Sequence, residues 1–204
     1  MIKNLLSKED YIKLSTCDIA AITGPMAAGK NYICSLFEKD SFGLKGFVSI
    51  DADVVVHDAI KEATAEILSA FSEKAEEKGI VIQNPDGSLN RRELGKLLFS
   101  DKDLLAQQEN IVYPYVNKII DNFIKDNLDK KVLINATVLY KTTALLNRCQ
   151  VIIYVTAPFF TRLKRAHKRD GLSYRQIINR FRNQRNLLSK YKDTGKEIII
   201  INNK

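Results

Sequence analysis

The chain has 204 residues, 45% of them hydrophobic and 27% charged, which suits one α/β domain with an insertion and excludes a disordered chain. The formal net charge of +8 is concentrated between Arg162 and Lys192, where Asp170 is the only acidic residue. Such a stretch suits a polyphosphate at least as well as a nucleic acid, or it is simply a solvated helix face, and no recognised nucleic-acid module accompanies it.

The three cysteines are an odd number and form no C-x-x-C pair, which disfavours a disulfide framework or a zinc site. The first ten residues lack the apolar core of a signal peptide, and no apolar run is long enough to cross a bilayer. We therefore expect a cytoplasmic protein without a membrane partner, present as a monomer or a small homo-oligomer.

Short apolar runs separated by helical stretches predict a parallel sheet of about five strands covered by helices on both faces. The predicted strands are Ile19–Thr23, Phe47–Ile50, Val132–Ala136, Val151–Val155 and Ile198–Ile201. The interval 59–128 is too long for one crossover and reads as a helical insertion. Residues 1–58 and 129–204 are then the core of a P-loop NTPase-type α/β fold.

The first strand leads into a phosphate-loop pattern, G-x-x-x-x-G-K, that opens a helix. Its residues are Gly24, Pro25, Met26, Ala27, Ala28, Gly29, Lys30 and Asn31. Backbone N–H groups of such a loop and the helix N-terminus surround phosphate oxygens, and Lys30 adds an ammonium group to the outer phosphates. The pattern predicts ATP as ligand, and the alternative is a glycine-containing turn that binds nothing.

Two features point to a Mg²⁺ ion beside this loop. Asn31 stands where the motif has Ser or Thr, and its carbonyl oxygen can bind Mg²⁺ directly or through a water. Asp51 and Asp53 follow the second strand and would share one side of it if the strand continued that far. One carboxylate, Asp51, would then lie near the metal and the other would accept a proton, although either can instead cap the next helix.

Further along the chain, Asn84–Gly87 predicts a turn, and Pro114 should kink or restart a helix. Pro158 and Gly171 delimit a helix over Phe160–Asp170. Ser173 and Gln176 then form a capping box for a helix whose apolar side extends to Leu188.

The order of motifs resembles the dephospho-CoA kinase family over Ile19–Asn203. These motifs are T-G-x-x-x-x-G-K, I-D-A-D, D-G-S-L-N-R-R-E-L-G-K-L-L-F-S-D, Y-P and R-L-K-R-A-H-K-R-D-G-L-S. The third motif, Asp86–Asp101, is the most specific, since a phosphate loop alone occurs in many NTPases. The resemblance implies transfer of the γ-phosphoryl group of ATP to the 3′-hydroxyl of dephospho-CoA, an acceptor-binding role for 59–128, and a lid near 160–190.

The resemblance also implies roles for single residues. Asp53 matches the base that accepts the proton of the ribose hydroxyl, and Arg91 matches an arginine that binds the acceptor. Arg169 matches an arginine that closes on the transferring phosphate, where Arg165 can assist. Asn202 and Asn203 fall in the segment beside the adenine.

Three residues depart from the family pattern: Asn31, Tyr113 in place of a histidine at the acceptor site, and Lys141 in place of an acid. They leave two alternatives open. One is a degenerate phosphate-loop protein that binds a nucleotide or CoA-like ligand with little turnover, and the other is a kinase for a different small molecule.

Overall fold

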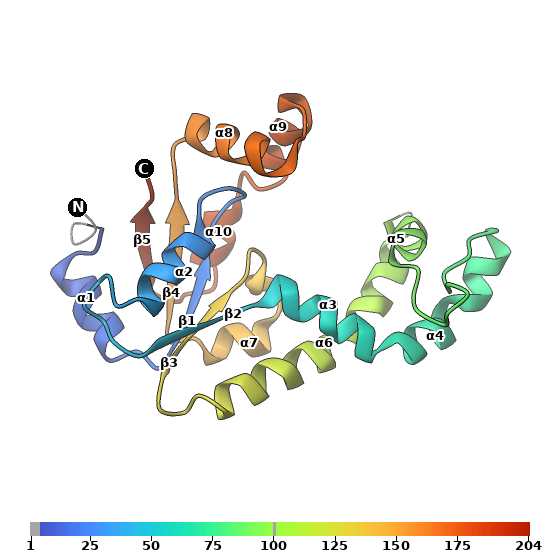
Figure 1. Cartoon of the computed structure of the whole chain (residues 1–204), viewed down its shortest axis with the longest axis horizontal. Coiled ribbons are helices and arrows are strands. Elements are labelled where there is room, and N and C mark those ends of the chain that lie inside the picture. Colours follow the sequence, from blue (N-terminus) through green and yellow to red (C-terminus); the bar gives the residue numbers. More distant parts are fainter. Residues whose placement is uncertain (1–4, 100) are drawn as a thin grey trace. The chain divides into compact units, whose positions relative to one another are not determined.

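The computed structural model describes residues 5–99 and 101–204 (Figure 1). The chain forms two compact units, one comprising the chain up to Asp51 together with Ile124–Lys204, and the other comprising Ala52–Phe123. The predicted insertion, 59–128, falls largely within the second unit.

The first unit is built on a five-stranded parallel sheet in the order β2-β3-β1-β4-β5. Its strands are β1 (Ile19–Thr23), β2 (Phe47–Asp51), β3 (Lys131–Asn135), β4 (Val151–Thr156) and β5 (Ile198–Asn202). The predicted α/β class and all five predicted strands are confirmed, with strand ends that differ by one residue at most. In the register, Asn135 lies opposite both Ile22 and Asp51, so three strands end at one level.

Helices pack on this sheet because β1, β3 and β4 are apolar along nearly their whole length. The helices and turns of this unit outside residues 159–182 are α1 (Lys8–Ser15), α2 (Lys30–Glu38), η2 (Leu139–Lys141), α7 (Thr143–Arg148) and α10 (Leu187–Lys192). α2 contacts β1, β2 and β3, and the ring of Phe37 on α2 packs at a tilt against that of Phe47 on β2, with ring centres 5.0 Å apart. The packing fixes the N-terminus of α2 at the carboxyl end of the sheet.

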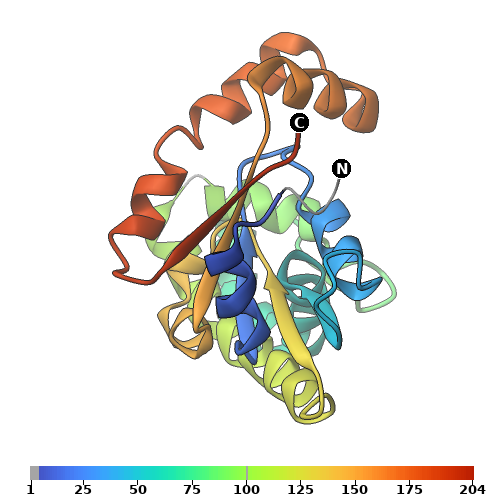
Figure 2. The same ribbon diagram turned by 90° about the vertical axis from the view of Figure 1, so that its left-hand side faces the viewer.

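Two helices, α8 (Phe159–Asp170) and α9 (Tyr174–Arg182), lie beyond the carboxyl end of β4 (Figures 1 and 2). The predicted helix end at Gly171 and the capping box of Ser173 and Gln176 are confirmed, and Gly171 adopts a left-handed conformation there. The prediction that the helix after Ser173 extends to Leu188 is wrong, because α9 ends at Arg182 and Leu188 belongs to α10. Between α9 and α10 the backbone forms turns in which an N–H donates to the carbonyl oxygen three residues earlier. In this segment the side chain of Gln184 accepts a hydrogen bond from the Met26 N–H.

The second unit contains α3 (Ala52–Glu62), α4 (Thr64–Glu77), α5 (Arg91–Phe99) and most of α6 (Lys102–Lys125). Ile67, Phe71, Leu97 and Ile120 are completely buried. The turn predicted at Asn84–Gly87 is present, with the Gly87 N–H donating to the Asn84 carbonyl oxygen at 3.0 Å.

Two expectations for this unit need correction. The predicted restart at Pro114 is wrong, because α6 continues through this residue: a proline removes one helical N–H donor while the turns on either side keep theirs. The alternative, a kink at Pro114, stays a prediction. The second strand does not continue through Asp53, because α3 begins at Ala52 directly after Asp51. Asp51 therefore ends a strand, whereas Asp53 lies in the first turn of a helix.

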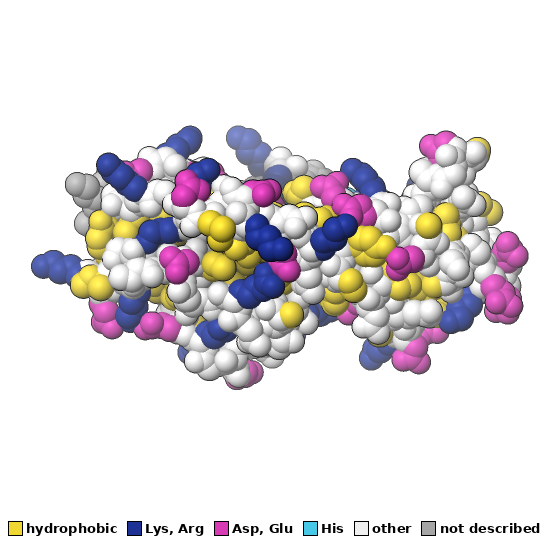
Figure 3. Space-filling model, turned by 90° about the horizontal axis from the view of Figure 1, so that it is seen from below, with side chains coloured by type: hydrophobic (Ala, Val, Ile, Leu, Met, Phe, Trp, Pro, Cys, Tyr) yellow, Lys and Arg dark blue, Asp and Glu magenta, His cyan; other side chains and the backbone are white. Residues whose placement is uncertain are grey.

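None of the helices in residues 5–99 and 101–204 has both the length and the hydropathy that a bilayer crossing requires. On the face seen in Figure 3, basic and acidic side chains alternate instead of forming one basic stripe. All three cysteines, Cys17, Cys34 and Cys149, are buried free thiols.

Candidate functional site

The loop Gly24–Asn31 joins β1 to α2 in a conformation that requires glycine at two positions. Gly24 has a φ of +147°, and a Cβ atom there would lie 2.1 Å from the carbonyl oxygen of Val155. Gly29 has a φ of +94°, and its Cβ would lie 2.1 Å from Nδ2 of Asn203. Gly24 and Gly29 can approach Val155 and Asn203 this closely only because they have no side chain. The loop therefore packs tightly at the N-terminus of α2, where backbone N–H groups bind anions.

Asn203, just beyond β5, holds this loop from outside. Its buried side-chain amide donates a 2.8 Å hydrogen bond from Nδ2 to the carbonyl oxygen of Ala28, and its backbone carbonyl oxygen accepts from Nη1 of Arg165 at 3.3 Å. Asn202, which the sequence indicates together with Asn203, is exposed at the end of β5. The prediction for Asn202 stays a prediction, while the contact with the loop is made by its neighbour.

A cavity of about 270 Å³ lies beside the loop. It is lined by Ala27, Gly29, Lys30, Asn31, Tyr32, Arg165 and Arg169. Among the described residues no carboxylate lines it, and three of the lining side chains are cations. The Lys30 ammonium is oriented by Thr137, whose Oγ1 accepts a 3.0 Å hydrogen bond from Nζ, and more weakly by the carbonyl oxygen of Gly24 at 3.4 Å. The cavity is therefore suited to a chain of phosphate groups.

Asn31 and Asp51 are brought together by Asn135, a buried residue at the end of β3. Nδ2 of Asn135 donates to Oδ1 of Asn31 at 2.9 Å and to Oδ2 of Asp51 at 3.2 Å. Within the described part of the chain, Oδ1 of Asn135 is buried without a hydrogen-bond partner. A carboxylate and two amide oxygens in one cluster are the donors that a hard cation such as Mg²⁺ takes, so these residues fit the ion that the sequence predicts.

Arg169 lies at the end of α8 and forms a two-point pair with its neighbour. Nε and Nη2 donate to the two carboxylate oxygens of Asp170 at 2.7 and 3.1 Å. The hydrogen bonds from Arg169 lower the pKa of Asp170 below its ordinary value. The Arg169 side chain is 62% exposed, so its guanidinium group can exchange this carboxylate for a phosphate with little desolvation.

The predicted acceptor residues lie in the second unit. Asp53 is exposed in the first turn of α3. Nη1 of Arg91, at the start of α5, lies 2.5 Å from Nδ1 of His57 on α3, which brings these two helices together at that point. Tyr113 is half-buried on α6.

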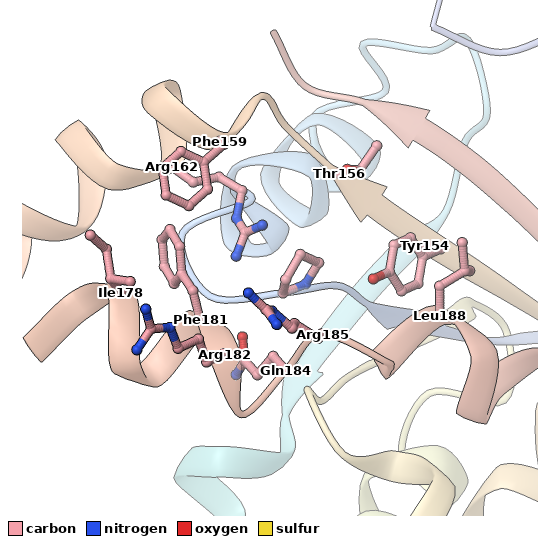
Figure 4. Close-up of a pocket in the computed structure, with 11 residues that line it drawn as sticks. Tyr154, Thr156, Phe159, Arg162, Ile178, Phe181, Arg182, Gln184, Arg185 and Leu188 are labelled. Carbon is pink, nitrogen blue, oxygen red and sulfur yellow. The ribbon is translucent and has the colours of Figure 1, made fainter. Parts of the chain in front are cut away.

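Arg162 on α8 and Gln184 just after α9 are both attached to the phosphate loop through the backbone of Met26. The Met26 N–H donates to Oε1 of Gln184 at 2.7 Å, and the Met26 carbonyl oxygen accepts from Nε of Arg162 at 2.9 Å. Figure 4 shows both side chains in the space between α8, α9 and β4. Two side chains that are each more than a hundred positions from Met26 in the sequence are thus bonded to this one residue of the loop.

Two residues at this site were missed from the sequence: Asn135 and Gln184. Asn135 had a recognisable signal, since it is a polar residue at the carboxyl end of an apolar strand, where ligands of parallel sheets bind. Gln184 had none, because a glutamine on a basic helical stretch looks like any solvated residue.

Comparison with known proteins agrees with this geometry. A model of the dephospho-CoA kinase family matches residues 18–204. The chain belongs to the dephospho-CoA kinase family. It is 33% identical to a dephospho-CoA kinase of Treponema denticola over 189 residues, which are 91% of this chain and 82% of the relative. A dephospho-CoA kinase of Treponema pallidum is 30% identical over 83% of this chain and 79% of its own length.

Solved structures show the same fold. The dephospho-CoA kinase from Campylobacter jejuni superposes with a TM-score of 0.56 at 25% identity, covering 92% of this chain and 88% of the other. A protein from Thermus thermophilus superposes with a TM-score of 0.71, also at 25% identity, over 91% of this chain and 88% of the other. The resemblance predicted from the motif order is confirmed, in spite of the departures at Asn31, Tyr113 and Lys141.

Proposed function

We infer that the chain transfers the γ-phosphoryl group of ATP to the 3′-hydroxyl of dephospho-CoA, the reaction of its family. The observation that carries this inference is the cavity beside Gly24–Asn31, which a glycine-dependent loop, a lysine and two arginines line and which no carboxylate of the described residues lines. Phosphoryl transfer depends mainly on positioning and on neutralising phosphate charge, and this cavity supplies both.

In this proposal the backbone of the loop and Lys30 bind the β- and γ-phosphates. Arg165 lines the same cavity and braces the loop through Asn203, so it helps to hold the nucleotide in place. Arg169 leaves Asp170 for the transferring phosphate, because its exposed pair with that carboxylate contributes little free energy.

Asp53 is proposed as the base that accepts the proton of the ribose hydroxyl, and Arg91 and Tyr113 as acceptor-binding residues. What supports the role of Asp53 is its exposed carboxylate in the first turn of α3, two residues after β2 ends, since ligands of parallel sheets bind beyond the carboxyl ends of the strands. The contact of Arg91 with His57 supports the role of Arg91, since His57 lies on α3, the helix that also carries Asp53.

Mg²⁺ is proposed as the cofactor, with Asn31 and Asp51 as its protein ligands. When bound with ATP, the ion neutralises phosphate charge and orients the phosphates. The supporting observation is the oxygen cluster in which Asn135 bonds to both side chains at once.

The test is formation of CoA from dephospho-CoA and ATP by the purified protein. The variant Asp53→Asn should lower kcat by about a hundredfold or more, since proton transfer by a placed base contributes at least that much, while ATP affinity in calorimetry stays unchanged. Asp58→Asn on the same helix is the matched control, because Asp58 pairs only with Lys61 on the surface among the described residues.

Wild-type turnover by Asp53→Asn would remove Asp53 from the role of base. ATP binding without any product across Mg²⁺ and Mn²⁺ would instead favour a degenerate nucleotide-binding protein. Product from a different acceptor in a screen of small alcohols and nucleosides would favour another kinase of this fold.

A further inference from the structure

A second cavity, of about 540 Å³, lies between β4, α8 and the segment that joins α9 to α10 (Figure 4). It is lined by Pro25, Tyr154, Thr156, Phe159, Arg162, Ile178, Phe181, Arg182, Gln184, Arg185 and Leu188. It has no lining residue in common with the cavity that contains Lys30. The two cavities are therefore separate, and both border the Gly24–Asn31 loop.

Arg162 is fixed in this cavity. Its guanidinium group lies over the ring of Phe181, 4.2 Å from the ring centre, while Nε is bonded to the Met26 carbonyl oxygen. In the described part of the chain neither Nη nitrogen has a hydrogen-bond partner, so both can donate into the cavity. Burial lowers the pKa of Arg162, but an arginine remains charged at neutral pH.

Arg185 is the second cation of the cavity. Its guanidinium group and that of Arg162 point into the same space in Figure 4. Its side chain has neither an ion pair nor a hydrogen bond to the described residues. Gln184 uses Oε1 to accept from the Met26 N–H, which leaves its amide nitrogen as a donor. No carboxylate of the described chain lines the cavity, so its polar side favours an anion with several oxygens.

The other side of the cavity is apolar. Phe159 and Phe181 meet edge to face with ring centres 5.7 Å apart, and Ile178 and Leu188 continue this wall. A ligand that fills the space must combine a phosphate-like group with an apolar arm.

We propose that this cavity is a second anion subsite, which binds a diphosphate group between Arg162 and Arg185 and the attached arm against Phe159, Phe181 and Leu188. Two sources share this chemistry: the acceptor substrate, which carries a diphosphate next to its long arm, and a separate diphosphate ester acting as an effector. The first source rests on the proposed function, whereas the subsite itself does not.

The probe for the subsite is inorganic pyrophosphate, titrated by calorimetry into protein saturated with ADP so that the Lys30 cavity is already filled. Arg185→Gln should weaken pyrophosphate binding about tenfold or more, because one charge-assisted contact is lost. ADP affinity should not change. Arg175→Gln is the matched control, since Arg175 is an exposed arginine on α9 that does not line the cavity.

Equal pyrophosphate affinity in the wild type, Arg185→Gln and Arg175→Gln would overturn the proposal, as would the absence of binding to ADP-saturated wild type. Steady-state kinetics separate the sources. A rise in KM for dephospho-CoA in Arg185→Gln, with kcat retained, assigns the subsite to the acceptor, whereas an unchanged KM together with weakened pyrophosphate binding assigns it to an effector. Failure of the wild type to form CoA would refute the proposed function and leave the calorimetric result standing.

Discussion

Replacement of Gly29 by alanine tests whether the phosphate loop is held in shape by its contact with Asn203. The new Cβ would lie 2.1 Å from Nδ2 of Asn203, so the amide must move away and lose its 2.8 Å bond to the Ala28 carbonyl oxygen. Leaving that buried acceptor unpaired costs about 1–3 kcal/mol. An alanine at positive φ costs about 1–2 kcal/mol more.

The expected loss of unfolding free energy for Gly29→Ala is therefore about 2–5 kcal/mol, and a loss of about 3 kcal/mol lowers Tm by roughly 6–12 °C for a chain of this size. Denaturant unfolding and calorimetry measure both quantities. Gly171→Ala is the control, because Gly171 also has a positive φ, of +65°, but a Cβ there would meet no atom within 4 Å. It should show the backbone strain alone.

The double variant Gly29→Ala/Asn203→Ala distinguishes this explanation from strain by itself. Asn203→Ala already removes the hydrogen bond and the obstacle, so the double variant should be more stable than the sum of the two single losses predicts, by about 1–3 kcal/mol. If the two losses add to within about 0.5 kcal/mol, the contact with Asn203 is not what makes Gly29 necessary.

Three further predictions concern charge and protonation. Asn31→Thr should lower the Mg²⁺ concentration that half-saturates turnover, and an unchanged Mg²⁺ dependence would mean that Asn31 already serves the ion. Arg169→Ala should lower kcat about a thousandfold with nearly unchanged ADP affinity, as expected of an arginine that acts on the transferring phosphate; a loss below tenfold would contradict that role. Burial raises the pKa of Cys34 to about 12, so its thiol should react with a chromogenic disulfide reagent at pH 8 much more slowly in the folded protein than in denaturant. Because the pKa is raised only in the folded state, the stability that this thiol contributes is complete below pH 9 and is lost as the pH rises towards 12. Unfolding curves of the wild type and of Cys34→Ala, compared across this pH range, measure the loss.

Local physics explains what could be predicted from the sequence. Short apolar strands, the glycines of the loop, the left-handed Gly171 and the capping box at Ser173 are encoded by neighbouring residues, and each occurs where the pattern indicates. The errors lie where distant contacts decide. α9 ends before Leu188 because Gln184 bonds to Met26, and no local pattern contains that information.

The sequence by itself determined the class of fold, the position of the phosphate loop and the family, because these depend on periodicity and on motifs read along the chain. Only the tertiary structure decided which side chains surround the loop. Asn135 reaches Asn31 and Asp51 because three parallel strands end at one level, and Asn203, rather than Asn202, faces the loop because successive residues of a strand point to opposite sides. The register of the sheet sets both outcomes, and register arises from packing across the whole core.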